Sequence, residues 1–258
     1  MRPLALVGNL SRDRVDGGPP RIGGAPFYGA AALRLLGRRG HVVAKCAGDD
    51  KRRYSRALAR VGVPVTFAPA AATTAFSFSY RGDARTMHVD DVGPVWKAAD
   101  VADIHAATWV HVAPLLRGDF DADALAAIAR GRRVLYDAHG LVRRRAAGPL
   151  ELDRDFDPAL LEHVAVLKLG EEEARVLEPV TELGVDEVVV TLGSRGAIVY
   201  AQGQETHVPA HPIAAVDPTG AGDAFGTAYA VSRAEGFRPV SAARRATAVV
   251  AAFLAADR

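Results

Sequence analysis

Short apolar runs recur along the chain, and most are followed by a stretch with a helical pattern. The runs are nearly continuous rather than alternating, which is typical of strands in a parallel sheet covered on both faces. They lie at 4–8, 41–47, 108–113, 134–136, 164–169 and 187–192. The stretches rich in Ala, Leu, Glu and Arg, which favour helices, lie at 25–36, 51–61, 121–130 and 171–177. This alternation predicts a doubly wound α/β sheet.

Two segments depart from this pattern. Residues 11–24 are polar and rich in Gly and Pro, and residues 73–89 alternate between small polar and aromatic side chains. Alternation with period two is typical of antiparallel strands with one wet face. We interpret the segments as a small β lid in which 73–89 pairs with 11–24, and the lid is a candidate contact with a second subunit, giving a homodimer. An ordinary edge hairpin is the alternative.

The C-terminal part changes pattern again. The apolar run at 187–192 meets a Gly-containing turn, and β character resumes at 197–200, which predicts an antiparallel hairpin. Two Ala-rich helices are expected at 220–233 and 239–255. With no repeat or linker in view, we expect residues 1–258 to form a single domain.

Composition narrows the class of protein. A chain of 258 residues can bury roughly 70–75% of its unfolded surface. Its one cysteine, Cys46, excludes an intrachain disulfide framework and a cysteine-based zinc site. No apolar stretch approaches the roughly 18–20 residues of a membrane span, and no signal-peptide core follows Met1. We therefore expect a cytoplasmic protein without a membrane partner.

The charge balance adds little. The 32 Lys and Arg residues nearly cancel the 30 Asp and Glu residues, and the basic clusters are short and scattered. Nucleic-acid binding calls for a basic stripe with interleaved aromatic residues, so we expect no nucleic-acid partner.

The most informative motif lies at residues 217–225. Pro218, Gly220 and Gly222 allow the backbone to turn tightly just before a helix, so that N–H groups and the positive end of the helix dipole face one point. This predicts an anion site. An acid beside a phosphate is repelled unless it accepts a proton, which marks Asp223 as a candidate base. The alternative is that Asp223 is an ordinary acid of a first helical turn.

The motif Asp-x-Thr-Gly-Ala-Gly-Asp-Ala-Phe resembles the signature of the ribokinase-like (PfkB) family of carbohydrate and nucleoside kinases. Similar landmarks follow the family's order at 8–13, 23–30, 137–143, 168–174 and 191–196, so the resemblance covers nearly the whole chain. It implies a three-layer α/β/α fold with a mostly parallel central sheet and a small β lid. The early GxGxxG fingerprint of nicotinamide-dependent enzymes and the GxxxxGK[ST] phosphate loop are both missing.

The resemblance implies transfer of the γ-phosphoryl group of ATP to a hydroxyl of a small polyhydroxylated substrate. Asp223 would be the base, and the backbone around Gly220, Ala221 and Gly222 would hold the developing charge. Glu173 would lie near Mg²⁺. The expected substrate contacts are Asp13, Gly24, Tyr28 and His139. The expected nucleotide contacts are Lys168, Thr191, Gly193, Gly196, Thr219, Ala246 and Val250.

Two positions depart from the family pattern, which usually has Asn at both. Tyr28 offers a stacking face and a hydroxyl, which favours a nucleoside or a cyclitol over a plain pentose, although sugar, nucleoside and cyclitol all stay open. Gly170 leaves Glu173 as the matching acid of its segment. A non-catalytic nucleotide- or sugar-binding regulatory protein on the same fold is the alternative function, and the retained Asp223 argues against it.

Overall fold

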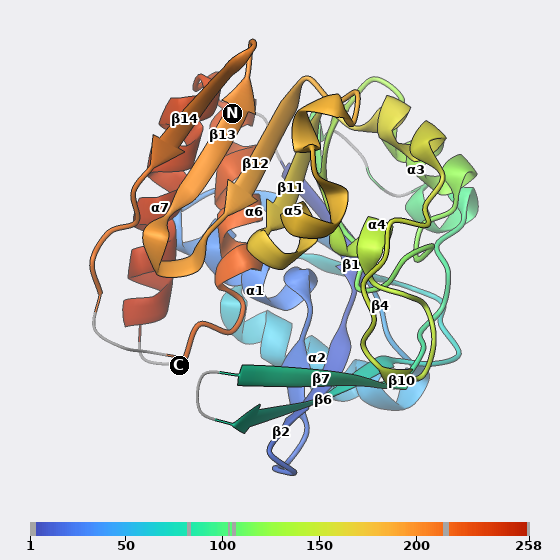
Figure 1. The fold of residues 1–258 in the computed structure, drawn as a ribbon. Coiled ribbons are helices and arrows are strands. Elements are labelled where there is room, and N and C mark those ends of the chain that lie inside the picture. The colour runs from blue at the N-terminus through green and yellow to red at the C-terminus, as the bar shows by residue number, and fades with distance from the viewer. Residues whose placement is uncertain (1–3, 82–83, 103, 105–106, 214–216, 257–258) are drawn as a thin grey trace.

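The computed structural model describes residues 4–81, 84–102, 104, 107–213 and 217–256. A nine-stranded sheet runs through the centre (Figure 1). Its order is β14 (Gln204–Val208), β13 (Ala197–Ala201), β12 (Glu187–Thr191), β11 (Val166–Gly170), β9 (Arg133–Asp137), β8 (Trp109–Ala113), β1 (Leu4–Asn9), β4 (Gly40–Lys45) and β5 (Val65–Ala68). The strands pair in parallel from β5 to β12, and β13 and β14 continue antiparallel.

All six predicted apolar runs are strands of this sheet, and the predicted hairpin is formed by β12 and β13. Their near-continuous apolar character has the expected cause, since β1 and β8 are buried along their whole length. The sequence patterns did not predict β5 and β14, which form the two edges.

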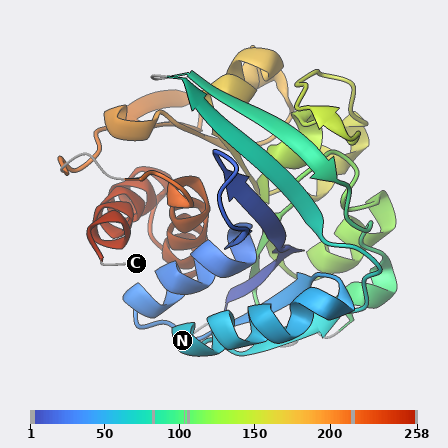
Figure 2. The ribbon, with the colours of Figure 1, turned by 90° about the horizontal axis from the view of Figure 1, so that it is seen from below.

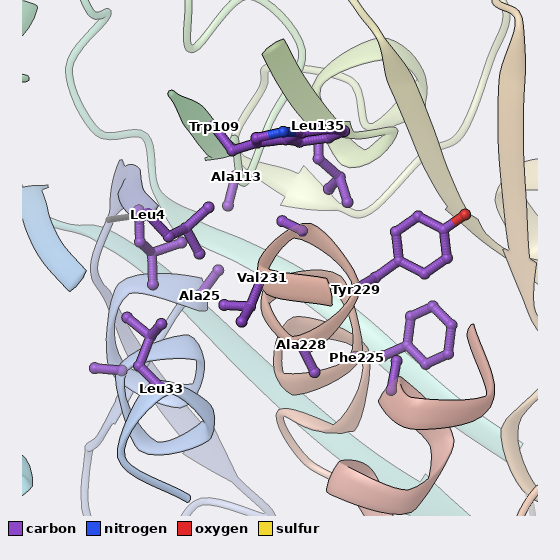
Figure 3. Close-up of a cluster of buried hydrophobic side chains, with 14 of the residues drawn as sticks. Leu4, Ala25, Leu33, Trp109, Ala113, Leu135, Phe225, Ala228, Tyr229 and Val231 are labelled. Carbon is purple, nitrogen blue, oxygen red and sulfur yellow. The ribbon is translucent and has the colours of Figure 1, made fainter. Parts of the chain in front are cut away.

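Helices cover both faces of the sheet. On one face, side chains of α1 (Ala25–Leu35), α2 (Gly48–Val61), α6 (Ala221–Ala234) and α7 (Pro239–Ala255) share a core with the strands. Figure 3 shows Leu4, Trp109 and Leu135 of the sheet against α1 and α6. On the other face lie α3 (Ala122–Ala129), α4 (His139–Val142) and α5 (Glu171–Leu177). Short 3-10 turns occur at Ala98–Val101, Pro158–His163, Val180–Glu182 and Gly193–Arg195.

A second sheet has the order β10 (Gly148–Pro149), β7 (Ala84–Asp91), β6 (Thr74–Arg81), β2 (Ser11–Val15) and β3 (Arg21–Gly23). Ser11 of β2 lies opposite Thr74 of β6, which confirms the predicted pairing, while 82–83 at the segment's tip lie outside the described residues. Phe76 and Val89 pack on Leu115 and Leu116. Figure 2 shows β6 and β7 crossing the end of the central sheet. This second sheet, here called the lid, therefore covers the end of the central sheet at which the parallel strands finish.

Among the described residues, none of the helices combines the length and the apolar composition that crossing a membrane requires.

Candidate functional site

The helix α6 begins at a backbone position that only glycine can occupy. Gly220 precedes the helix with φ 81° and ψ 0°, in the left-handed region that disfavours other residues. A Cβ at this position would lie 2.3 Å from Cγ of the Tyr28 ring. Conformation and space therefore both require glycine, and the Tyr28 ring lies directly against this turn.

A buried cation lies beside the first turn of α6. A Cβ on Gly222 would be 3.1 Å from Nζ of Lys168. Lys168 is 3% exposed and donates a hydrogen bond to Oδ2 of Asp137 at 2.9 Å. The first N–H groups of a helix have no intrahelical partner, and its dipole is positive at this end. Together with the ammonium group, they make this end of α6 suited to an anion.

Asp223 stands in the first turn of α6 with a side chain that is only partly exposed. Loss of water around the carboxyl and the negative charge of Asp137 raise its pKa to about 6, against the opposing effect of Lys168. A carboxylate with such a pKa is ionised at neutral pH and still accepts a proton more readily than an ordinary aspartate.

A second carboxyl, Asp13 on β2, is electrostatically coupled to Asp223. Burial raises the pKa of Asp13 to about 6, a hydrogen bond from Ser11 opposes this, and Asp223 raises it further. A Cβ on Gly23 would lie 2.0 Å from Oδ2 of Asp13. Gly24 has φ 91°, and a Cβ there would lie 2.5 Å from the carbonyl oxygen of Asn9. Gly23 thus lets the backbone pass close to the Asp13 side chain, and Gly24 lets it pass close to the Asn9 carbonyl.

Four ionisable side chains form a cluster, here called the charge cluster, between β9, α4 and α5. Nε2 of His139 lies 2.8 Å from Oε1 of Glu173, and its Nδ1 lies 3.5 Å from Oδ1 of Asp137. Arg143 reaches the same Glu173 oxygen at 3.6 Å. Burial alone would raise the pKa of Glu173, but His139 and Arg143 hold it well below its usual range. Asp137 is fully buried, which by itself would raise its pKa, but His139 and Lys168 lower the pKa below its usual value.

A cavity of about 380 Å³ opens next to the start of α6, between the turn after β12, residues 210–213 and α7. Its walls include the predicted nucleotide contacts Thr191, Gly193, Gly196 and Val250, together with Ala221 and Gly222 of α6. Apolar side chains supply much of the rest: Pro212, Ile213, Phe225, Ala251 and Leu254. The cavity therefore combines an apolar wall with the anion-suited end of a helix.

Other predicted site residues lie elsewhere. Ala246 is fully buried in the core beside α6, and it is not among the residues that line the cavity. Thr219 donates to Oδ1 of Asp217 within the turn before α6. The Tyr28 hydroxyl donates to the carbonyl oxygen of Ile22 at 3.4 Å. His139 belongs to the charge cluster.

Sequence reasoning left out two members of this site. Asp137 and Arg143 stand in a segment that resembles a family landmark, yet neither was predicted as a site residue. The available signal was that Asp137 ends a buried strand, since ligands of open α/β sheets gather at the carboxyl ends of the strands.

Comparisons with known proteins fit this geometry. Residues 20–256 match the family model described as "pfkB family carbohydrate kinase". An inositol 3-kinase of Oryza sativa subsp. japonica is 30% identical over 247 residues, 87% of this chain and 61% of that protein. An inositol 3-kinase of Zea mays is 32% identical over 215 residues, 78% of this chain and 55% of that protein. The chain thus spans about three fifths of the length of these relatives.

A solved structure resembles nearly the whole chain. It is a pyrophosphate-dependent kinase in the ribokinase family complexed with a pyrophosphate analog and myo-inositol. The TM-score is 0.85 at 25% identity, with 97% of this chain and 94% of the other covered. The predicted three-layer fold is thereby confirmed.

Proposed function

The chain belongs to the pfkB family of carbohydrate kinases, and on that premise we propose that it transfers the γ-phosphoryl group of ATP to a hydroxyl of a cyclitol or a sugar. One observation carries the proposal. Asp223, with its pKa raised to about 6, lies in the first turn of α6, at the anion-suited end of that helix, and its charge raises the pKa of a second carboxyl, Asp13. A base at this end of the helix would be able to take a proton from a hydroxyl that attacks a bound phosphate.

Cyclitols come first among the acceptors. Two carboxylates that influence one another, Asp13 and Asp223, can accept hydrogen bonds from neighbouring hydroxyls of one ring. The relatives named above are inositol kinases, and the solved neighbour was complexed with myo-inositol. Stacking of a base on Tyr28 gains no support, because its ring is packed against the Gly220 turn.

The cavity beside α6 supports ATP as the donor. Its volume of about 380 Å³ lies in the range of small-molecule sites, and its apolar walls suit a nucleobase. Pyrophosphate, the donor of the solved neighbour, carries no group that would use Phe225, Val250 or Leu254. We therefore propose a nucleoside triphosphate, with pyrophosphate as the competing donor to be tested.

The reaction is an in-line displacement. As the substrate oxygen forms its bond to the γ-phosphorus, Asp223 accepts the hydroxyl proton. The bond to the bridging oxygen breaks, and ADP leaves with the electron pair. Lys168 and the backbone N–H groups at Gly220 and Gly222 oppose the charge on the transferred group, whereas the Ala221 N–H already donates to the carbonyl oxygen of Pro218 at 3.0 Å. Positioning and charge neutralisation supply most of the rate.

Magnesium fits the acidic part of the site. Carboxylates suit Mg²⁺, and Oδ1 of buried Asp137 has no hydrogen-bond partner among the described residues. Both oxygens of Glu173 already receive donors, from His139 and from the Gly170 N–H, so Glu173 would hold the ion through its water ligands. When bound, the ion would neutralise charge on the donor phosphates.

The test is a matrix of acceptors and donors. Myo-inositol, ribose, fructose and inosine are each assayed with ATP and with pyrophosphate, in the presence of Mg²⁺. We expect turnover of myo-inositol with ATP. Pyrophosphate turnover that exceeds ATP turnover would overturn the donor, and preference for ribose or fructose would overturn the acceptor. Thermal stabilisation by ATP without turnover of any polyol would favour the regulatory alternative.

A further inference from the structure

Glu173 is held at both carboxylate oxygens. It is the third residue of α5, and its carboxylate folds back so that Oε2 accepts a 2.6 Å hydrogen bond from the Gly170 N–H. Oε1 faces Nε2 of His139 at 2.8 Å. Glu173 is only 5% exposed, so its charge depends on these donors and on Arg143, which lies 3.6 Å from Oε1. One donor comes from its own helix start, and the other from a different part of the chain.

His139 is itself fixed between two carboxylates. Its ring nitrogens face Oε1 of Glu173 and Oδ1 of Asp137, and its side chain is 18% exposed. Asp137 holds Lys168, whose Nζ lies beside Gly222 at the start of α6. The ring is therefore the link between Glu173 and the chain of contacts that leads to the anion-suited turn.

Gly170 has no structural need to be glycine. Its φ of −86° and ψ of 169° suit any residue. A Cβ there would meet its nearest neighbour, Oε2 of Glu173, at 3.4 Å, which is an ordinary contact. The position precedes a helix, where Asn is among the preferred residues. A side-chain amide at 170 would stand within reach of the Glu173 carboxylate, so the position could carry a donor for Glu173 and does not.

We propose that His139 is a positioning residue, which supplies from the start of α4 the side-chain donor for Glu173 that Gly170 lacks. The inference rests on the proposed function for its kinetic consequence and on the contacts of Glu173 and His139 for its geometry. A substrate-binding role, expected for His139 from the sequence, is not needed. Its loss should act on the metal and the donor phosphates, and it should spare the polyol.

Kinetics give the first test. His139→Ala should raise the Mg²⁺ concentration for half-maximal activity by about tenfold, as the loss of an outer partner of a metal site commonly does. The KM for the polyol should change less than twofold. His139→Gln keeps an N–H donor and should stay near the wild type. Gly170→Asn should restore much of the loss in the His139→Ala background. His163→Ala, on the Pro158–His163 turn, is the matched control.

A second readout needs no ligand. The short hydrogen bond should move the Gly170 amide proton to low field in the NMR spectrum of the free protein. His139→Ala should shift that resonance, and adding Gly170→Asn should restrain the Glu173 carboxylate again. If His139→Ala changes neither the Gly170 resonance nor the Mg²⁺ dependence, the proposal is overturned. It is also overturned if His139→Ala raises the KM for the polyol as much as the Mg²⁺ requirement and Gly170→Asn restores neither. If the wild type phosphorylates no polyol, the proposed function fails, and the resonance alone decides the role of His139.

Discussion

Two helices begin at the candidate site, and they use their N-termini in opposite ways. The start of α6 has a glycine with a left-handed backbone and a buried lysine beside it, and this arrangement offers positive charge to a ligand. The start of α5 has an ordinary backbone and three glutamates in its first turn. The carboxylate of one of them, Glu173, accepts a hydrogen bond from the N–H of Gly170, the residue before the helix. The positive end of the helix dipole would thus face an external anion at α6 under the proposed function, whereas at α5 it faces the internal carboxylate of Glu173.

The contrast separates two kinds of functional information. At α6 the anion-suited geometry resides in the backbone, where glycine is required, and the proposed base Asp223 is added to it. At α5 it resides in a side chain held by residues from other elements, His139 and Arg143. Substitutions should therefore damage the two starts differently.

The largest effect is expected at α6. Asp223→Asn keeps the shape of the side chain and removes the base, so kcat should fall by roughly 10²–10⁴-fold. ATP binding should persist, as measured by the thermal shift that ATP and Mg²⁺ produce. A variant with near wild-type kcat would show that Asp223 is not the base. The start of α6 would then differ from that of α5 only in its backbone.

Lys168 connects the two starts, and its loss comes next. Lys168→Met would leave the buried Asp137 without its cation, and breaking such a pair costs about 3–5 kcal/mol of unfolding free energy. Lys168→Met with Asp137→Asn should recover part of this, because the orphaned charge is gone. Chemical denaturation of the wild type, the single variant and the double variant measures both effects. Equal stability of the single and double variants would contradict a buried ion pair.

The two glycines provide a matched pair of intermediate effect. Gly220→Ala forces a side chain into the left-handed region and into the Tyr28 ring, and it should cost roughly 1–3 kcal/mol. Gly170→Ala meets neither obstacle and should stay within about 0.5 kcal/mol of the wild type. Thermal unfolding of both variants tests this directly. Similar losses at the two positions would abolish the distinction between backbone and side-chain starts.

The smallest effect is a pH dependence. Asp223 must be unprotonated to accept a proton, and its pKa is raised to about 6. Activity should therefore be present above pH 6 and fall about tenfold per unit below it. Asp13 has a pKa raised to the same value and should steepen this decline in kcat/KM where the acceptor depends on its charge. The profile of Asp13→Asn should then decline less steeply, and a flat profile down to pH 4.5 would exclude the raised pKa of Asp223.

The sequence predicted the inner strands well and the edges poorly. Strands buried on both faces are mostly apolar along their length, which the pattern at 4–8 displays directly. The edge strand β5 is half-buried except at Ala68, and β14 is mostly exposed except at Val208, so neither has a continuous apolar run. These edge strands form because they pair with a neighbouring strand, and the local amino-acid composition does not predict that pairing.

The site divides in the same way. The turn before α6 is local in sequence, so Gly220, Gly222 and Asp223 could be identified together. The partners of the charge cluster are distant in sequence, and Asp137 and Lys168 stand 31 residues apart. The pattern also gave no sign that Tyr28 would pack on Gly220, because that contact joins α1 to α6.

The coupling of Asp13 to Asp223 has a consequence for the order of assembly. One carboxyl follows the first strand, while the other stands on a helix near the C-terminal side that packs on α1. Most of the chain must be synthesised before the two can meet, and contacts this distant in sequence form slowly. A nascent chain therefore contains the sequence of its lid strands and of its whole central sheet before it contains the second of the two carboxylates that we propose to hold the acceptor. The appearance of activity would then indicate that α6 has docked against the N-terminal part of the chain.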